Sequence, residues 1–300
     1  MNGFAVRSAG ILAFLTVVAL SGCTNTTSEI PSATDFKLPE SIPVSIHTAC
    51  TETDRLQASE CLVKEYLPML DSIFEPVVTS RGRAFETPTV FLADPTAETA
   101  CGTLSSPAYC PTDQSLVIPL EKISNLGDRA PDATLERVLF NPAVREYFTR
   151  ELSAEERRTG GAYSAVIATV HEYAHHVQNL IGSIDVYRNQ TDGDPKFASQ
   201  RIELEADCLT GWVSGYLNKT GAHVPSTLDN WAAATTLTEI GDDFMEPGLG
   251  TQGHGTIEQR VAAWQEGIIA GITLSEPYAA CMDITEQVLA GTTGGQTTRP

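Results

Sequence analysis

The chain of 300 residues has few basic residues: 19 lysines and arginines stand against 38 aspartates and glutamates, and the formal net charge at pH 7 is -19. Because a surface of this charge repels phosphates, the composition argues against a nucleic-acid partner. The sequence also lacks internal repeats and any C-x-x-C pair. Hydrophobic residues make up 42%, so we expect a packed core in one large domain or two small ones.

A long apolar segment is missing as well. The longest, residues 9–20, is too short to span a bilayer comfortably, and it ends before Leu20-Ser21-Gly22-Cys23. This tetrapeptide resembles a bacterial lipobox, whose cysteine is lipidated and becomes the mature N-terminus. An ordinary signal peptide with a chance cysteine is the alternative. We therefore expect residues 1–22 to be a lipoprotein signal peptide and Cys23 to anchor an exported protein by lipid to a membrane of the bacterial cell envelope, with its domain outside the cytoplasm.

Six cysteines remain beyond Cys23, and an even number in an exported chain indicates disulfides. The short loops favour Cys50–Cys61 and Cys101–Cys110, which leaves Cys208–Cys281. Many other pairings are open, and metal binding by some cysteines is an alternative that the absence of C-x-x-C disfavours.

The composition divides the chain into segments. Residues 23–45, rich in Thr, Ser and Pro, read as a flexible tether, residues 46–290 as the folded domain and residues 291–300 as a disordered tail. The predicted fold class of the domain is α+β, mostly helical with a small sheet.

Two strands are predicted, at 89–93 and 115–120, and Pro119 suits a sheet edge or a strand end. Apolar periodicity predicts several helices. Their ranges are 53–75 with an interruption near Pro68, 133–150 as one or two helices, 162–182 after Gly160-Gly161, 196–217, 228–241 and 256–270.

The helix predicted at 162–182 contains an H-E-x-x-H motif formed by His171, Glu172 and His175. Positions i and i+4 share one helix face, so both imidazoles can hold one zinc ion. Glu172 adjoins the first ligand, where a carboxylate can take a proton from activated water. The alternative is a pair of surface histidines on an amphipathic helix.

A catalytic zinc site needs a third protein ligand, and the segment RIELEADC offers one. Glu203 and Asp207 are spaced i, i+4 on the next predicted helix. Glu203 would complete the ligand set, and Asp207 would accept a hydrogen bond from the outer N–H of a ligand histidine. Glu205 would lie on the opposite side and face solvent. The alternative is a solvated acidic face.

Several motifs together resemble the predicted neutral zinc metallopeptidases of bacteria. These are HEYAHHVQ, RIELEADC, IGDD, GHGTIEQR and the pair Cys101-Gly102 and Tyr109-Cys110-Pro111, and the resemblance covers roughly residues 85–283. It departs from the family at Ala174, where Gly is common, and in the N-terminal part of the mature chain.

The resemblance has implications for fold and function. It implies a zincin-like fold of the gluzincin group, in which the Glu of an E-x-x-x-D motif is the third ligand; here that is Glu203, with Asp207 supporting the site. It further implies one Zn²⁺, a peptide or protein substrate, and endopeptidase activity by metal-activated water.

Other residues are assigned by position. His254, between two glycines, is a candidate donor to the oxyanion, with an inert loop histidine as the alternative. Arg260 is expected to pair with Asp207 or another carboxylate of the site. We expect His176 either to be structural or to support a ligand residue of the site, and His47 and His223 to lie on the surface.

We also expect strand 115–120 to bind extended peptide at a sheet edge and the Cys101–Cys110 loop to rim the cleft. A Cys208–Cys281 bridge would stiffen the segment carrying Glu203. Two other functions stay open: a catalytically silent zinc-binding lipoprotein acting as a binding or scaffold module, and zinc-dependent hydrolysis of a non-peptide bond.

Overall fold

The structure is a computed structural model, and it describes most of the predicted domain. The described residues are 30–34, 36–38, 50, 54–93, 95–128, 154–190, 195–223, 227–239 and 253–292. Cys23, His47, the helices predicted at 133–150 and the IGDD segment lie outside these ranges, so the predictions about them stay predictions.

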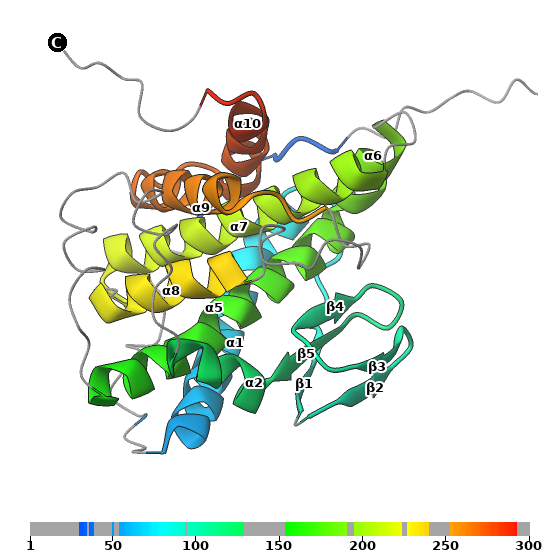
Figure 1. The fold of residues 1–300 in the computed structure, drawn as a ribbon. Coiled ribbons are helices and arrows are strands. Elements are labelled where there is room, and N and C mark those ends of the chain that lie inside the picture. The colour runs from blue at the N-terminus through cyan, green and yellow to red at the C-terminus, as the bar shows by residue number, and fades with distance from the viewer. Residues whose placement is uncertain are drawn as a thin grey trace, which may run out of the picture.

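Helices dominate the described residues, and the strands are short (Figure 1). The helices are α1 Arg55–Thr79, α2 Leu120–Ser124, α5 Ala154–Ile181, α6 Ser183–Gln190, α7 Pro195–Thr220, α8 Thr227–Glu239, α9 Ile257–Ile272 and α10 Pro277–Leu289, with a 3-10 turn at Asn125–Asp128. The strands are β1 Thr89–Ala93, β2 Ala97–Thr99, β3 Gly102–Leu104, β4 Ala108–Cys110 and β5 Ser115–Pro119. The predicted α+β class is confirmed at this level: mostly helix, with a small sheet.

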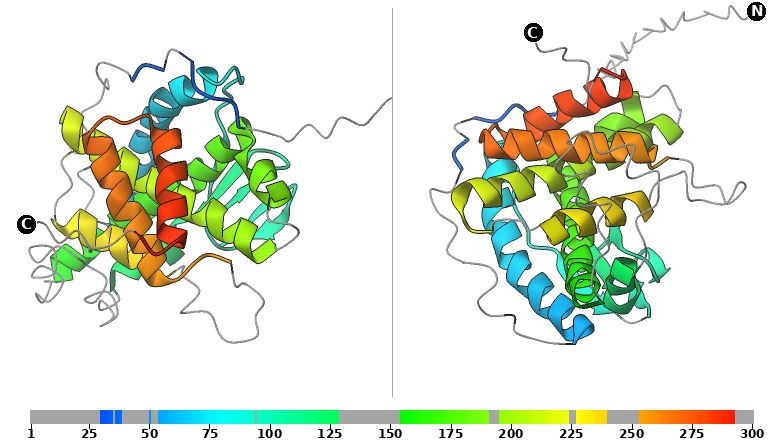
Figure 2. Two further views of the ribbon diagram at one scale, coloured as in Figure 1. Left: turned by 90° about the horizontal axis from the view of Figure 1, so that it is seen from above. Right: turned by 60° about the vertical axis from the view of Figure 1, so that its left-hand side comes forward.

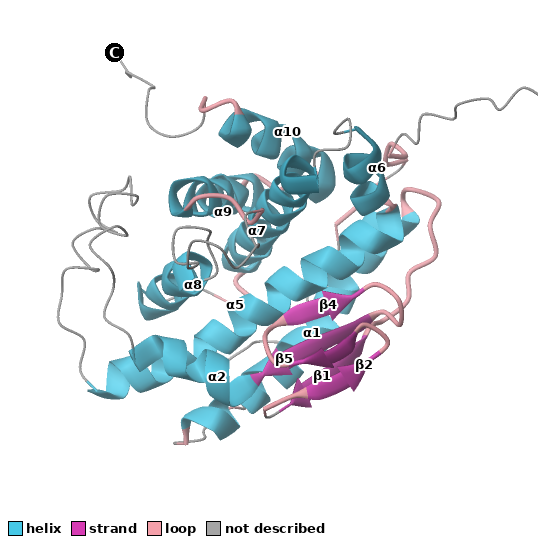
Figure 3. Ribbon diagram, turned by 45° about the vertical axis from the view of Figure 1, so that its right-hand side comes forward, coloured by secondary structure: helices cyan, strands magenta, loops and turns pink. Residues whose placement is uncertain are grey.

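The strands gather on one side of the molecule (Figure 3). β5 lies at the centre of a three-stranded sheet, parallel to β1 and antiparallel to β4, while β2 and β3 form a separate hairpin. The prediction that 115–120 is an edge strand is therefore wrong. Pro119 is tolerated because it is the last residue of the strand, the other position that a missing N–H allows.

α5 is the central helix, and α1, α7, α8 and the sheet pack around it (Figure 1). The predicted interruption of α1 near Pro68 is wrong, since α1 runs unbroken through Pro68 and Pro76. Its buried face packs along α5, and this packing outweighs the backbone hydrogen bonds that the prolines remove. Gly160-Gly161 likewise lies inside α5 instead of preceding it.

α7 and α9 approach each other closely because glycines line their contact. A Cβ atom on Gly211 would lie 2.0 Å from the carbonyl oxygen of Trp264, and one on Gly267 would lie 2.1 Å from that of Cys208. α10 lies beside both helices (Figure 2) and is tied to α7 by the Cys208–Cys281 disulfide. The close contact between α7 and α9 places side chains of α9 against the acidic segment of α7.

All three predicted disulfides are present: Cys50–Cys61, Cys101–Cys110 and Cys208–Cys281. Among the described residues, no helix combines the length and the apolar character that crossing a membrane requires.

Candidate metal centre

Two histidines of α5 and one glutamate of α7 converge. The buried rings of His171 and His175 are 4.7 Å apart, centre to centre, and nearly perpendicular. The Nε2 atom of His171 lies 3.1 Å from Oε2 of Glu203, and that of His175 lies 3.5 Å from Oε1 of the same carboxylate. The i, i+4 spacing on α5 thus has the predicted effect, and the three residues offer ligand atoms within 4.8 Å of one another.

The outer side of His171 faces a buried charge pair. Its Nδ1 atom lies 3.0 Å from Oδ1 of Asp207, and Arg260 of α9 donates to the same oxygen at 2.8 Å. A second nitrogen of Arg260 lies 3.7 Å from Glu203. Asp207 thus lies beside His171, and Arg260 lies beside Asp207, where we expected them; their roles at a metal site stay predictions. Burial opposes a charge on His171, but Asp207 and Glu203 raise the pKa of its imidazole to about 10.

The outer side of His175 faces Gln178, whose Oε1 atom lies 2.8 Å from Nδ1 of the ring. Gln178 also contacts Glu205 at 2.8 Å. The prediction that Glu205 faces solvent is wrong: the residue is fully buried, because α6 covers the side of α7 opposite the cavity. This burial raises the pKa of Glu205.

Glu172 lies beside the three converging side chains and is itself buried. Burial raises the pKa of its carboxyl group, while the neighbouring His175 and His171 lower it in part. A carboxyl group whose pKa is shifted toward neutrality can both accept and return a proton. The position suits the predicted role as a general base, which stays a prediction.

A cavity of about 640 Å³ opens in front of these residues. Its helical wall includes Thr236 and Glu239 of α8 together with the four residues of the site. Its other wall is formed by residues 106–109 and by Lys122, Ile123 and Leu126. Ala168 of α5, one helical turn before Glu172, packs with Ile123 and Leu126 to form an apolar section of the cavity where the two walls meet.

His254 also lines the cavity, as predicted, and Gly255 after it has φ +89°, a conformation that requires glycine. β4, rather than β5, is the sheet edge at the cavity: Ala108 and Tyr109 belong to its lining. Both residues lie within the loop closed by Cys101–Cys110, so this loop borders the cavity as expected.

The two other histidines among the described residues differ in outcome. His176 lies 2.6 Å from the carbonyl oxygen of Glu86 and 3.2 Å from the Tyr109 hydroxyl, so its predicted structural role is confirmed. The prediction for His223 is wrong: it is 2% exposed, stacks on Tyr163 and lies 3.4 Å from Asp229. It follows the end of α7, where no periodic pattern signals burial.

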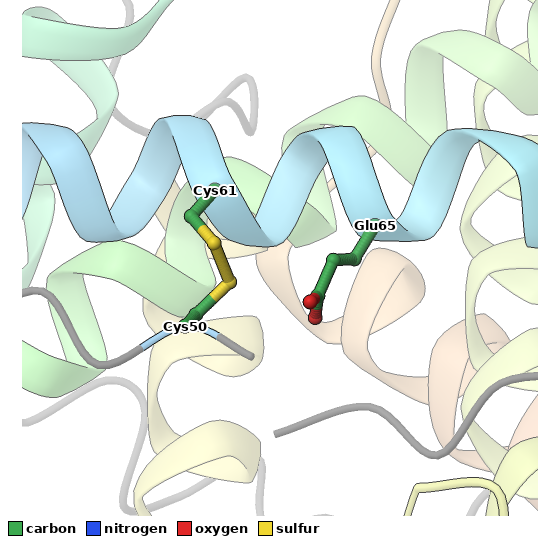
Figure 4. Close-up of side chains that lie close together, drawn as sticks. All are labelled: Cys50, Cys61 and Glu65. Carbon is green, nitrogen blue, oxygen red and sulfur yellow. A yellow bond between two sulfur atoms is a disulfide. The ribbon is translucent and has the colours of Figure 1, made fainter. Parts of the chain in front are cut away.

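A second group of potential ligand residues is Cys50, Cys61 and Glu65 (Figure 4): Cys61 and Glu65 lie in the first half of α1, and Cys50 precedes that helix. Both sulfur atoms are joined in a disulfide, so neither is a thiolate that could bind a metal. The first group is different in kind. Two imidazole nitrogens and one carboxylate oxygen, next to a cavity, are the donor set of a catalytic zinc site. The residues fit the ion.

Sequence reasoning missed Gln178, Glu205 and Tyr109 as members of the site. Gln178 was within reach, since it lies at i+3 from His175 and so on the same helix face. Tyr109 joins the site only through tertiary contacts: its hydroxyl lies beside His176 and Asn179. No pattern within residues 108–110 indicates those partners.

Comparison with known proteins supports the same assignment. A family model described as "Putative neutral zinc metallopeptidase" matches residues 137–276. The uncharacterized protein YpfJ of Escherichia coli K12 is 26% identical over 205 residues, which are 63% of this chain and 61% of that protein. The uncharacterized protein Rv2575 of Mycobacterium tuberculosis H37Rv is 24% identical over 207 residues, 65% of this chain and 60% of that one.

This chain thus spans about three fifths of the length of the curated relatives it matches. No solved structure matches it. The resemblance that the motifs indicated is confirmed: residues 137–276 match the model of the putative neutral zinc metallopeptidase family.

Proposed function

We propose that this protein is a zinc-dependent endopeptidase with a zincin-like catalytic domain. The observation that carries the proposal is the position of Glu172: a buried carboxyl group beside three converging ligand residues, at the wall of a cavity. A site that only stores metal has no need of this carboxyl group.

His171, His175 and Glu203 would hold one zinc ion. When bound, zinc lowers the pKa of water and polarises a substrate carbonyl. Glu172 takes a proton from the attacking water and delivers one to the leaving amine. His254, at the cavity wall, donates a hydrogen bond to the carbonyl oxygen of the substrate, on which negative charge develops.

The substrate is a peptide in extended conformation. β4 is an edge of the described sheet, and Ala108 and Tyr109 line the cavity, so a peptide strand can pair there with backbone groups. The apolar section formed by Ile123, Leu126 and Ala168 suits an apolar side chain of that peptide.

The protein is exported and anchored by lipid at Cys23. Three disulfides among the described residues fit an oxidising compartment outside the cytoplasm. Replacing Cys23→Ala should release the protein from membranes into the soluble fraction. Persistent membrane association of this variant would argue for a different anchor.

The activity is tested with Glu172→Gln, which keeps the shape of the side chain and removes its basicity. Zinc content should stay near one ion per chain, while peptide cleavage should fall by about 10²–10⁴-fold. Both are measured on the same preparations, by elemental analysis and by cleavage of a broad peptide library. A wild type that holds zinc but cleaves nothing would favour the alternative, a zinc-binding lipoprotein without turnover. Cleavage of other bonds alone would favour hydrolysis of a non-peptide substrate.

A further inference from the structure

We infer that Gln178, held in one orientation by Glu205, is a positioning residue that makes Nδ1 of His175 carry its proton and turns the Nε2 lone pair toward the cavity. The inference rests on the zinc site of the proposed function and assigns a role to two buried residues outside its ligand set.

The contacts of Gln178 fix which end of its amide faces His175. Its nitrogen lies 2.9 Å from the carbonyl oxygen of Ile202 and 2.8 Å from Oε1 of Glu205. A backbone carbonyl can only accept a hydrogen bond, so the NH₂ group must be the end that faces Ile202 and Glu205. The chemistry of these neighbours thus decides the amide orientation.

The orientation of Gln178 then decides the protonation site on the histidine ring. The amide oxygen lies 2.8 Å from Nδ1 of His175, and an oxygen at that position can only accept. Nδ1 must therefore be the nitrogen with the hydrogen. In a neutral imidazole this leaves a lone pair on Nε2, the atom that faces Glu203 at 3.5 Å.

Glu205 is suited to hold this arrangement because it cannot turn away. It is fully buried, and it also accepts hydrogen bonds from the Tyr187 hydroxyl and, at 3.4 Å, from Ser183. Both donors belong to α6, which covers the side of α7 away from the cavity. A buried network with every member satisfied is rigid, so the position of Glu205 is transmitted to the ring of His175.

The two ligand histidines are thus oriented by different groups. His171 has a carboxylate, Asp207, at its outer nitrogen, whereas His175 has a neutral amide backed by a carboxylate. A direct carboxylate partner increases the basicity of an imidazole more than an amide does. The predicted consequence is that Gln178 serves mainly orientation and tautomer at His175.

The test uses full-length protein, zinc and the variant Gln178→Met, which keeps volume and removes the acceptor. Competition with a chelator should show zinc affinity reduced by about 10–100-fold. NMR of zinc-loaded protein with ¹⁵N-labelled histidine should show a slowly exchanging Nδ1–H on His175 in the wild type and faster exchange in the variant.

Three further variants separate this role from general packing. Tyr187→Phe removes one donor to Glu205 but leaves Gln178 in place, so zinc affinity should fall by less, and Nδ1–H exchange should quicken by less, than in Gln178→Met. Glu205→Gln keeps an acceptor oxygen for Gln178 and should resemble the wild type, while Glu205→Met should lose zinc affinity and speed the exchange.

Equal zinc affinity and equal exchange in wild type and Gln178→Met would overturn the inference and leave the proposed zinc site standing. A wild type that binds no zinc at His171, His175 and Glu203 would refute both. If Gln178→Met does not fold, the pair Glu205→Met and Glu205→Gln decides, and equal zinc affinity in that pair would overturn the inference.

Discussion

The helical and the sheet sides of the cavity differ in the kind of group they contribute. α5, α7 and α9 supply buried ionisable side chains that contact one another, from His171 through Asp207 to Arg260. β4 and α2 supply apolar side chains and the backbone of a short edge strand. Under the proposed function, the difference implies a division of labour: the helices would hold the metal and the base, and the sheet side would hold the substrate. Substitutions should therefore impair metal binding and substrate binding separately.

The largest effect is expected from Glu203→Ala on the helical side. Losing a group that only orients a ligand histidine reduces zinc affinity by ~10–100-fold. Losing a ligand itself should reduce it further, because only the two imidazoles would then hold the ion. Zinc affinity is measured by chelator competition. Glu258→Ala, which removes an exposed glutamate of α9, is the matched control and should bind zinc normally. Equal losses in the two variants would remove Glu203 from the ligand set.

On the sheet side, the double replacement Cys101→Ser and Cys110→Ser should loosen the loop that borders the cavity. Opening a loop of this length should cost about 3 kcal/mol in the free energy of unfolding. We expect a higher KM for peptides with zinc affinity unchanged, since no ligand residue belongs to this loop. A fall in zinc affinity as large as that of Glu203→Ala would contradict the separation of the two sides.

The contact between α7 and α9 supports the helical side from behind. Gly267→Ala places a Cβ atom where only 2.1 Å separates it from the Cys208 carbonyl oxygen, so the helices must move apart. We expect a loss of about 1–3 kcal/mol in the free energy of unfolding. Ile269→Ala, at a residue of α9 that is 55% exposed, should be nearly neutral in the same thermal-unfolding measurement. A neutral Gly267→Ala would mean that the helices are not in tight contact.

The smallest expected effect is the number of protons released when zinc binds. In the metal-free protein the pKa of His171 is raised to about 10, so at pH 7.5 its imidazole carries a proton that zinc must displace. Burial opposes a charge on His175, but Glu203 raises the pKa of that imidazole as well. Zinc loading should therefore release at least one proton in total, measured by calorimetry in buffers of different ionisation enthalpy. Release should diminish as pH rises through 10. No release at pH 7.5 would show that His171 is already neutral before the metal binds.

How well each side of the cavity could be predicted from the sequence depends on the length and periodicity of its elements. α5 and α7 are long and periodic, and the i, i+4 rule placed His171, His175, Glu203 and Asp207 without knowledge of the fold. The sheet side was harder, because three-residue strands such as β4 have no periodicity and their pairing depends on distant segments. Hence β5 was assigned to an edge it does not occupy.

The prediction that Glu205 faces solvent was wrong for a related reason. Helix geometry correctly placed it opposite Glu203, but only tertiary packing tells whether the opposite side of a helix meets solvent or a further helix, here α6. The three disulfides were predictable because two loops are short and only one pair then remained.

The most direct measurement is X-ray absorption at the zinc edge of the zinc-loaded protein, combined with anomalous diffraction from a crystal of it. The account predicts one ion between His171, His175 and Glu203, with nitrogen and oxygen ligands at about 2.0–2.2 Å and no sulfur at about 2.3 Å. Zinc bound elsewhere, a sulfur ligand, or three side chains that do not close on the ion would contradict it.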